Sequence, residues 1–186
     1  MKNIYAIHGA FSSPVIFNYV RRQMGPSYTW HFLDYQNETG GLRDLIANAH
    51  SFTRPHHVIG HSMGGLMALA LINQPWVCSV TTISTPLGGV NMNLVQQYLS
   101  RSEFMTDISS SGDFIRGLHK STPSKPVQHL VSTHGFNPWI YEPNDGVITL
   151  RSQRAFALGS VHDVASNHAE IMMNDRTVEL LQKFCV

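Results

Sequence analysis

Gly60-His61-Ser62-Met63-Gly64-Gly65 is the most informative segment of this 186-residue chain. Glycines two positions before and after a serine are typical of a sharp turn between a strand and a helix, because a Cβ at either position would clash. The apolar run 57–59 before the turn is of strand type and begins shortly after Pro55, and the run 66–72 after it favours a buried helix. The stretch therefore predicts a strand, an elbow that carries Ser62, and a helix.

Runs of the same two kinds alternate along the rest of the chain. This alternation is typical of βαβ units, so we expect an α/β fold: a mostly parallel sheet of about six strands with helices on both faces. The expected strands are 3–7, 28–33, 57–59, 79–84, 127–133 and one near Asp163, and the expected helices are 14–25, 41–52, 66–72 and 176–184.

Ser62 follows a predicted strand, which is where parallel sheets carry their functional sites. A serine hydroxyl is a poor nucleophile until a base takes its proton, and a carboxylate must hold that base in the correct tautomer. On this architecture the acid and then the histidine follow the serine in the chain. Other predicted strand ends carry Gly9, Asp34, the run 84–86 and the loop after Thr133.

Asp145 is the favoured acid of such a triad. It lies in the turn-rich loop 142–147, shortly after the expected strand 127–133. An aspartate before a glycine is also a common turn residue, which is the structural alternative. Asp163 is the second candidate, although it lies close before the candidate base, and Asp34 precedes the serine and would need a reordered triad.

His168 is the favoured base, because it lies in a loop between the last expected strand and the final helix, from which it can reach Ser62. His162 is the alternative, but a position on a strand would aim its ring less freely. The eleven histidines and two cysteines show no H-E-x-x-H spacing and no Cys/His cluster, so we expect no metal and no cofactor.

Two backbone N–H groups must stabilise the oxyanion of the tetrahedral intermediate. Met63 is expected to supply one at the start of the elbow helix, where the helix dipole favours negative charge. The loop after the first strand is expected to supply the other, with Ala10 favoured and Phe11 second, since Gly9 lets the backbone approach the substrate. The Phe11 side chain is expected to bind substrate beside the acyl group, with a place in the core as the alternative.

The region 87–126 interrupts the alternation, because it contains only weak helical patterns around 92–98 and 113–119. Its position between two strands at the active edge suits a small cap or lid, and an ordinary long crossover is the alternative. Large side chains here and in the loop before Asp145 suit either a pocket rim or ordinary packing: Met92, Tyr98, Phe104, Met105, Phe114, Trp139 and Tyr141.

Composition restricts the class of protein. Charged residues make up 13% of the chain, hydrophobic residues 42%, and the formal net charge is +1, so the chain is not of the disordered type and indicates no nucleic-acid partner. The length favours a single domain, 1–186. No window approaches the ~18 apolar residues of a membrane span, and two cysteines indicate no disulfide framework. Because the first expected strand begins at residue 3, we expect no signal peptide. We expect a cytoplasmic protein without stable membrane insertion.

Five segments together resemble the α/β-hydrolase superfamily, and most of all its small bacterial lipases and esterases with a minimal sheet. They are 7–11, 60–65, 84–89, 144–148 and 167–171, in the family's order. The resemblance implies Ser62 as nucleophile, Asp145 as acid and His168 as base. It also implies oxyanion donors at Ala10 and Met63. The first expected strand corresponds to the family's third, so we expect the leading antiparallel hairpin to be missing. The expected lack of a secretion signal favours an intracellular ester or thioester over bulk triglyceride.

These features predict a serine esterase of the lipase type that cleaves a small-molecule ester through an acyl-serine intermediate. An acyl thioesterase or lipid acyl hydrolase would use the same residues, but the chain shows no basic patch for a CoA phosphate. A non-catalytic binding module on the same fold is the alternative from another class. Such modules usually lack a triad member, whereas all three positions have candidates here.

Overall fold

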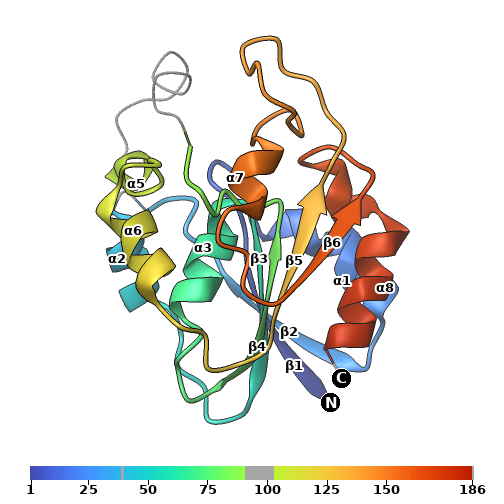
Figure 1. Cartoon of the computed structure of the whole chain (residues 1–186). Helices are drawn as coiled ribbons and strands as arrows, with labels where there is room; N and C mark the ends of the chain where they lie inside the picture. The colour runs from blue at the N-terminus through green and yellow to red at the C-terminus, as the bar shows by residue number, and fades with distance from the viewer. Residues whose placement is uncertain (39, 91–102, 186) are drawn as a thin grey trace.

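The computed structural model describes residues 1–38, 40–90 and 103–185. Within these residues six strands form one sheet in the order β2-β1-β3-β4-β5-β6, and every neighbouring pair is parallel (Figure 1). The predicted α/β class with a parallel sheet of about six strands is confirmed. The strands are β1 (Lys2–Ile7), β2 (Tyr28–Leu33), β3 (His56–His61), β4 (Val77–Ile83), β5 (Val127–Ser132) and β6 (Ser160–Val164).

Helices cover both faces of the sheet, as predicted. Helices α1 (Asn18–Met24) and α8 (Asp175–Phe184) lie on one face, and α2 (Leu42–Ala47), α3 (Met63–Ala70) and α6 (Asp113–Lys120) lie on the other (Figure 1). Shorter helical segments are η1 (Pro14–Phe17), α5 (Glu103–Asp107), α7 (Leu150–Arg154) and η2 (Glu170–Met173). In the described part of the chain, no helix combines the length and the apolar character that crossing a membrane requires.

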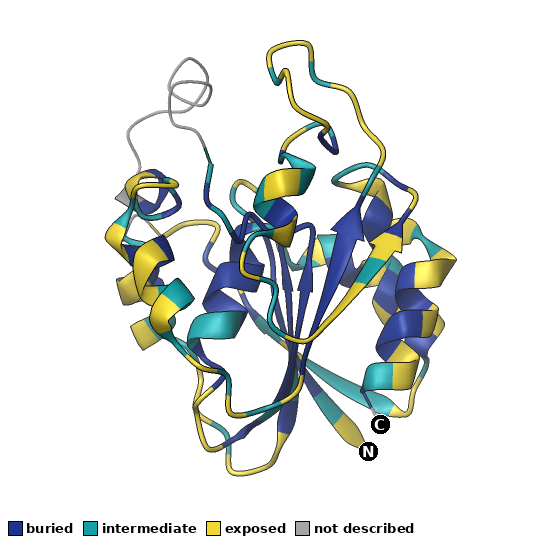
Figure 2. Ribbon diagram, viewed as in Figure 1, coloured by how far each residue is buried: buried dark blue, intermediate teal, exposed yellow. Residues whose placement is uncertain are grey.

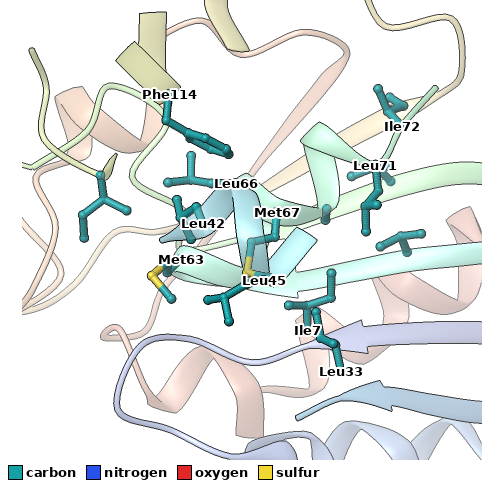
Figure 3. Packing of buried hydrophobic residues seen from close by; sticks show 14 of the residues in the cluster. Ile7, Leu33, Leu42, Leu45, Met63, Leu66, Met67, Leu71, Ile72 and Phe114 are labelled. Carbon is teal, nitrogen blue, oxygen red and sulfur yellow. The ribbon is translucent and has the colours of Figure 1, made fainter. Parts of the chain in front are cut away.

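Each face of the sheet has its own apolar core, and the central strands β3, β4 and β5 are largely buried between the two (Figure 2). On one face, Leu66 of α3 belongs to a cluster with Leu42 of α2 and Ile7 of β1 (Figure 3). On the other face, Phe17 and Leu181 belong to a second cluster. The first six residues of α3 are all buried, so the helix packs into the core directly after the turn that carries Ser62.

The central strands read as nearly continuous buried runs, because both of their faces are covered. All six residues of β5 are buried, whereas β6 at the sheet edge buries only Val164. Val127, Leu130 and Val131 make β5 recognisable as a strand although its other three residues are polar, whereas the exposed β6 gives a weaker signal. The five-residue α7 is likewise too short to show a helical period, and the sequence does not predict it.

The region 87–126 is described in part. Its residues 103–126 include α5 and α6, and α6 confirms the helical pattern around 113–119. The pattern at 92–98, with Met92 and Tyr98, lies outside the described residues. Phe104, Met105 and Phe114 are buried in the cluster that contains Leu42 and Leu66. These three side chains therefore pack into the core, and the pocket-rim alternative is wrong for them.

Candidate active site

Ser62 lies at the tip of a strained turn between β3 and α3. Its backbone has φ 54° and ψ −125°, a region that side-chain-bearing residues rarely adopt. Its N–H donates to the carbonyl oxygen of Ile83 at the end of β4, at 2.8 Å. A Cβ at Gly60 would lie 2.2 Å from the carbonyl oxygen of Gly64, so the strand and the helix approach too closely for any other residue there. The turn is thus the elbow that the sequence predicts.

The structure brings Ser62, His168 and Asp145 together in one hydrogen-bonded chain. The Oγ of Ser62 lies 3.1 Å from Nε2 of His168, and Nδ1 of His168 lies 2.7 Å from Oδ2 of Asp145. The three side chains follow β3, β6 and β5 respectively, at the carboxyl edge of the sheet. The fold thus brings His168 into contact with Ser62, which lies 106 positions away in the chain, and with Asp145, which lies 23 positions away.

The Asp145 carboxylate is buried and surrounded by donors. Its Oδ1 accepts from the N–H groups of Val147 at 3.0 Å and Ile148 at 2.7 Å. Its Oδ2 accepts from the Ser132 hydroxyl at 2.5 Å and from Nε2 of Gln153 at 3.0 Å, besides His168. Burial by itself raises the pKa of this carboxyl, but the hydrogen bond and charge of His168 and the Ile148 and Ser132 donors hold the pKa below its ordinary value. The group is therefore ionised at neutral pH.

Ser132 and Gln153 are site residues that sequence reasoning missed. Gln153, on α7, also accepts from the Ser132 N–H at 3.1 Å and donates to the Ser132 carbonyl oxygen at 3.2 Å. The Ser132 hydroxyl lies 2.7 Å from that of Ser84, at the end of the neighbouring strand. A serine that ends a buried strand next to the candidate acid's loop was a usable signal for Ser132. Nothing in the sequence pointed to Gln153, because α7 itself was not predicted.

The loop after β1 approaches Ser62 at Gly9. A Cβ at Gly9 would lie 2.9 Å from Cβ of Ser62, so glycine is required for this approach, and Ala10 follows directly. The buried His8 holds the loop: its Nδ1 donates to the Gly9 carbonyl oxygen at 2.8 Å, while its Nε2 accepts from the Tyr35 N–H at 3.3 Å. Tyr35 in turn stacks on His8 and donates its hydroxyl to the His8 carbonyl oxygen at 2.6 Å.

The two backbone N–H groups expected at the oxyanion belong to the residue after Ser62 and to the residue after Gly9. Met63 is the first residue of α3, so its N–H has no acceptor within the helix. Ala10 lies on the loop that Gly9 brings against the serine. Their assignment as oxyanion donors stays a prediction.

Phe11 is exposed, which rules out the core alternative for its side chain. It has φ 55° and 65% exposure, and its ring lies 5.6 Å from that of Phe104 on α5. The loop after β1 therefore contacts α5, within the described residues 103–126. Trp139 and Tyr141 are also exposed, on the long loop between β5 and α7.

The residues considered as alternatives lie elsewhere. Asp163 on β6 binds Arg154 through both carboxylate oxygens at 2.8 Å, at the protein surface. Asp34 lies 3.4 Å from Nε2 of His8, and His162 is paired in the sheet with Leu130 of β5. Among the described residues no three His, Cys, Asp or Glu side chains gather as a metal site would require.

Solved structures resemble this chain over nearly its whole length. The mature lipase BlEst2 from Bacillus licheniformis is 17% identical, with a TM-score of 0.71 covering 100% of this chain and 92% of that one. A hydrolase from Oleispira antarctica is 15% identical, with a TM-score of 0.72 covering 100% and 91%. A lipase-esterase related protein from Clostridium acetobutylicum is 15% identical, with a TM-score of 0.69 covering 98% and 94%. No protein-family model and no curated protein matches the sequence.

At sequence identities of 15% to 17%, the similarity to these structures is evidence for a shared backbone fold. That fold is a parallel sheet with helices on both faces and a strand, elbow and helix at its centre. It is shared with proteins described as lipases, esterases and other hydrolases. On these grounds the chain adopts the α/β-hydrolase fold.

Proposed function

We propose that this protein is a serine hydrolase that cleaves carboxylic esters through an acyl-serine intermediate. The observation that carries the proposal is the continuous hydrogen-bonded chain from Ser62 through His168 to the buried, ionised Asp145. Nucleophile, base and orienting acid in this geometry are the parts that acyl transfer needs. The names of the similar structures, among them lipases and an esterase-related protein, support the same class of reaction.

In the first half of the reaction, Ser62 Oγ attacks the ester carbonyl carbon while Nε2 of His168 takes the hydroxyl proton. Asp145 accepts the Nδ1–H of His168, which keeps Nε2 unprotonated before attack and stabilises the imidazolium that forms. The negative charge that develops on the carbonyl oxygen is stabilised by the backbone N–H groups of Met63 and Ala10.

Collapse of the tetrahedral intermediate breaks the bond to the leaving alcohol, which receives the proton from His168. The acyl group stays on Ser62 as an ester. Water then repeats the attack with His168 again as the base, which releases the acid and restores the serine hydroxyl. All proton transfers pass through the same imidazole, and none requires a metal or a cofactor.

A Ser62→Ala variant tests the proposal. We expect wild type to hydrolyse p-nitrophenyl esters and to be labelled by a fluorophosphonate probe, and the variant to lose both activities while its thermal unfolding stays close to that of wild type. An active Ser62→Ala variant would contradict the mechanism. Absence of labelling in wild type would instead favour a non-catalytic binding module on this fold.

The leaving group is tested separately. Acyl thioesterases and lipid acyl hydrolases use the same residues, so a series of p-nitrophenyl esters of rising chain length is compared with acyl-CoA substrates. We expect higher kcat/KM on the simple esters. Preference for acyl-CoA would redirect the proposal to a thioesterase without changing the roles of Ser62 and His168.

A further inference from the structure

His61 stands between Gly60 and Ser62 and contacts the base rather than the nucleophile. It ends β3, where it pairs with Ile83 of β4, and is 3% exposed. Its Nε2 lies 2.9 Å from the backbone carbonyl oxygen of His168, and the two imidazole rings are 5.0 Å apart. The residue that precedes the serine is therefore hydrogen-bonded to the main chain of the residue that must deprotonate it.

The surroundings of His61 determine its protonation state. A carbonyl oxygen can only accept, so Nε2 carries the proton and Nδ1 carries a lone pair. Within the described part of the chain, Nδ1 is buried and has no hydrogen-bond partner, so a second proton there would be a buried, unsatisfied donor on a cation. Burial, and after it the charge of His168, lowers the pKa of His61 to about 3. The ring is thus neutral in one tautomer.

His61 also lies against the loop that leads to Ala10. A Cβ at Gly9 would be 3.4 Å from Nδ1 of His61. One neutral ring therefore borders the elbow, the loop after β1 and the loop that carries His168.

We propose that His61 is a positioning residue for the hydrolysis, holding the main chain of His168 so that its imidazole spans Ser62 and Asp145. The inference rests on the proposed function. His168 lies in a loop before η2, and its own N–H donates to the Asp145 carbonyl oxygen at 3.0 Å. The bond from His61 restrains the other side of the same residue. Both the N–H and the carbonyl oxygen of His168 are therefore hydrogen-bonded, which restrains the backbone that carries its imidazole.

Hydrolysis depends on this restraint, because the proton passes between two atoms only 3.1 Å apart. A misplacement of about 1 Å in a catalytic group costs on the order of 100-fold in rate. His61 supplies its restraint as a neutral group. A cation in its place would lie close to the imidazolium that His168 becomes during turnover.

Three variants test the inference. His61→Phe keeps a ring but removes the donor, and His61→Gln places an amide N–H where it can donate to the same carbonyl oxygen. His57→Phe is the matched control. His57 is half-buried on the same strand, at the end farther from the elbow, and its Nδ1 lies 2.6 Å from Ser79 Oγ. For each, kcat and KM on a p-nitrophenyl ester, the rate of fluorophosphonate labelling and the thermal midpoint are measured.

We expect His61→Phe to lower kcat and the labelling rate by up to about 100-fold with KM near that of wild type. His61→Gln should recover most of that loss, and His57→Phe should keep the kcat of wild type. A His61→Phe variant that folds and retains the kcat of wild type overturns the inference, and so does a folded His61→Gln variant as slow as His61→Phe. A wild-type protein that is neither labelled nor active instead overturns the proposed function.

Discussion

Asp145 and Asp163, the two candidate triad acids that follow the serine, differ in what surrounds their carboxylates. Asp145 is 1% exposed and accepts five hydrogen bonds, two at Oδ1 and three at Oδ2. Asp163 is solvent-exposed and pairs with Arg154. An acid that holds an imidazole in one tautomer must itself be fixed and ionised, and these conditions are met at Asp145.

Replacing each of these acids by asparagine separates their roles. In Asp145→Asn an amide group faces the Nδ1–H of His168, which favours the tautomer that cannot accept the serine proton, so kcat should fall on the order of 10⁴-fold. Asp163→Asn removes an exposed ion pair worth about 1 kcal/mol or less and should leave kcat nearly unchanged. Steady-state kinetics on an activated ester check both, and a larger loss of kcat in Asp163→Asn would contradict the assignment.

Helix α7 shows how one short element can serve a site that other elements form. It begins at Leu150 with Thr149 as its cap, whose side chain accepts from the Ser152 N–H, and it places Gln153 against the end of β5. Gln153 is 1% exposed and hydrogen-bonds both to Ser132 and to Asp145. The helix thereby ties the acid of the proposed triad to the sheet.

Substitution of this glutamine tests the coupling between α7 and the acid. In Gln153→Leu the buried N–H and carbonyl oxygen of Ser132 lose partners, at a cost of about 1–3 kcal/mol for each unsatisfied group, and Asp145 loses one donor. We expect lower stability together with lower kcat, measured by urea unfolding and by ester hydrolysis.

Gln128→Leu is the matched control for that variant. Gln128 is equally buried, on β5, and donates to Thr81 Oγ1 at 3.0 Å on the neighbouring strand, with no bond to Asp145. It should lose stability and keep its kcat. If the two variants lose kcat to the same extent, the effect is general loosening of the sheet and not the contact of α7 with the acid.

Buried histidines make the stability of the whole molecule sensitive to acid. The pKa of His61 is lowered to about 3 from an ordinary 6.5, with burial as the largest cause, and burial also lowers the pKa values of His56, His57 and His129. A group whose pKa is depressed on folding binds its proton more readily in the unfolded state. The protein should therefore lose stability as the pH falls below about 6.5, and His61 should contribute down to about pH 3.

Urea unfolding of wild type and His61→Gln between pH 7.5 and pH 4, a window set by the ordinary histidine pKa near 6.5, measures this dependence. The midpoint should fall with decreasing pH in wild type, and less steeply in the variant, because one buried neutral histidine is gone. Equal slopes in the two proteins would show that His61 titrates alike in the folded and unfolded states.

Much of the fold could be predicted because its signals are local. Strand-type and helix-type runs indicate which segments form strands and helices of the core. The strand β5 and the elbow helix α3 are predictable in this way, and most of their residues are buried. The edge strand β6 is only weakly predictable, since an exposed strand has no continuous apolar run. The five-residue α7 is not predictable, since so short a helix shows no hydrophobic periodicity.

Local patterns along the chain establish the elbow at Ser62, the alternation of strands and helices, and the strand-end side chains that are candidates for acid and base. The tertiary structure decided which of those side chains meet: it places Asp145 and not Asp163 at His168, adds Ser132 and Gln153 to the acid, and joins His61 to the backbone of His168. The physical reason is that these contacts depend on strand order and register. Both are set by packing across the whole sheet and cannot be read from neighbouring positions in the chain.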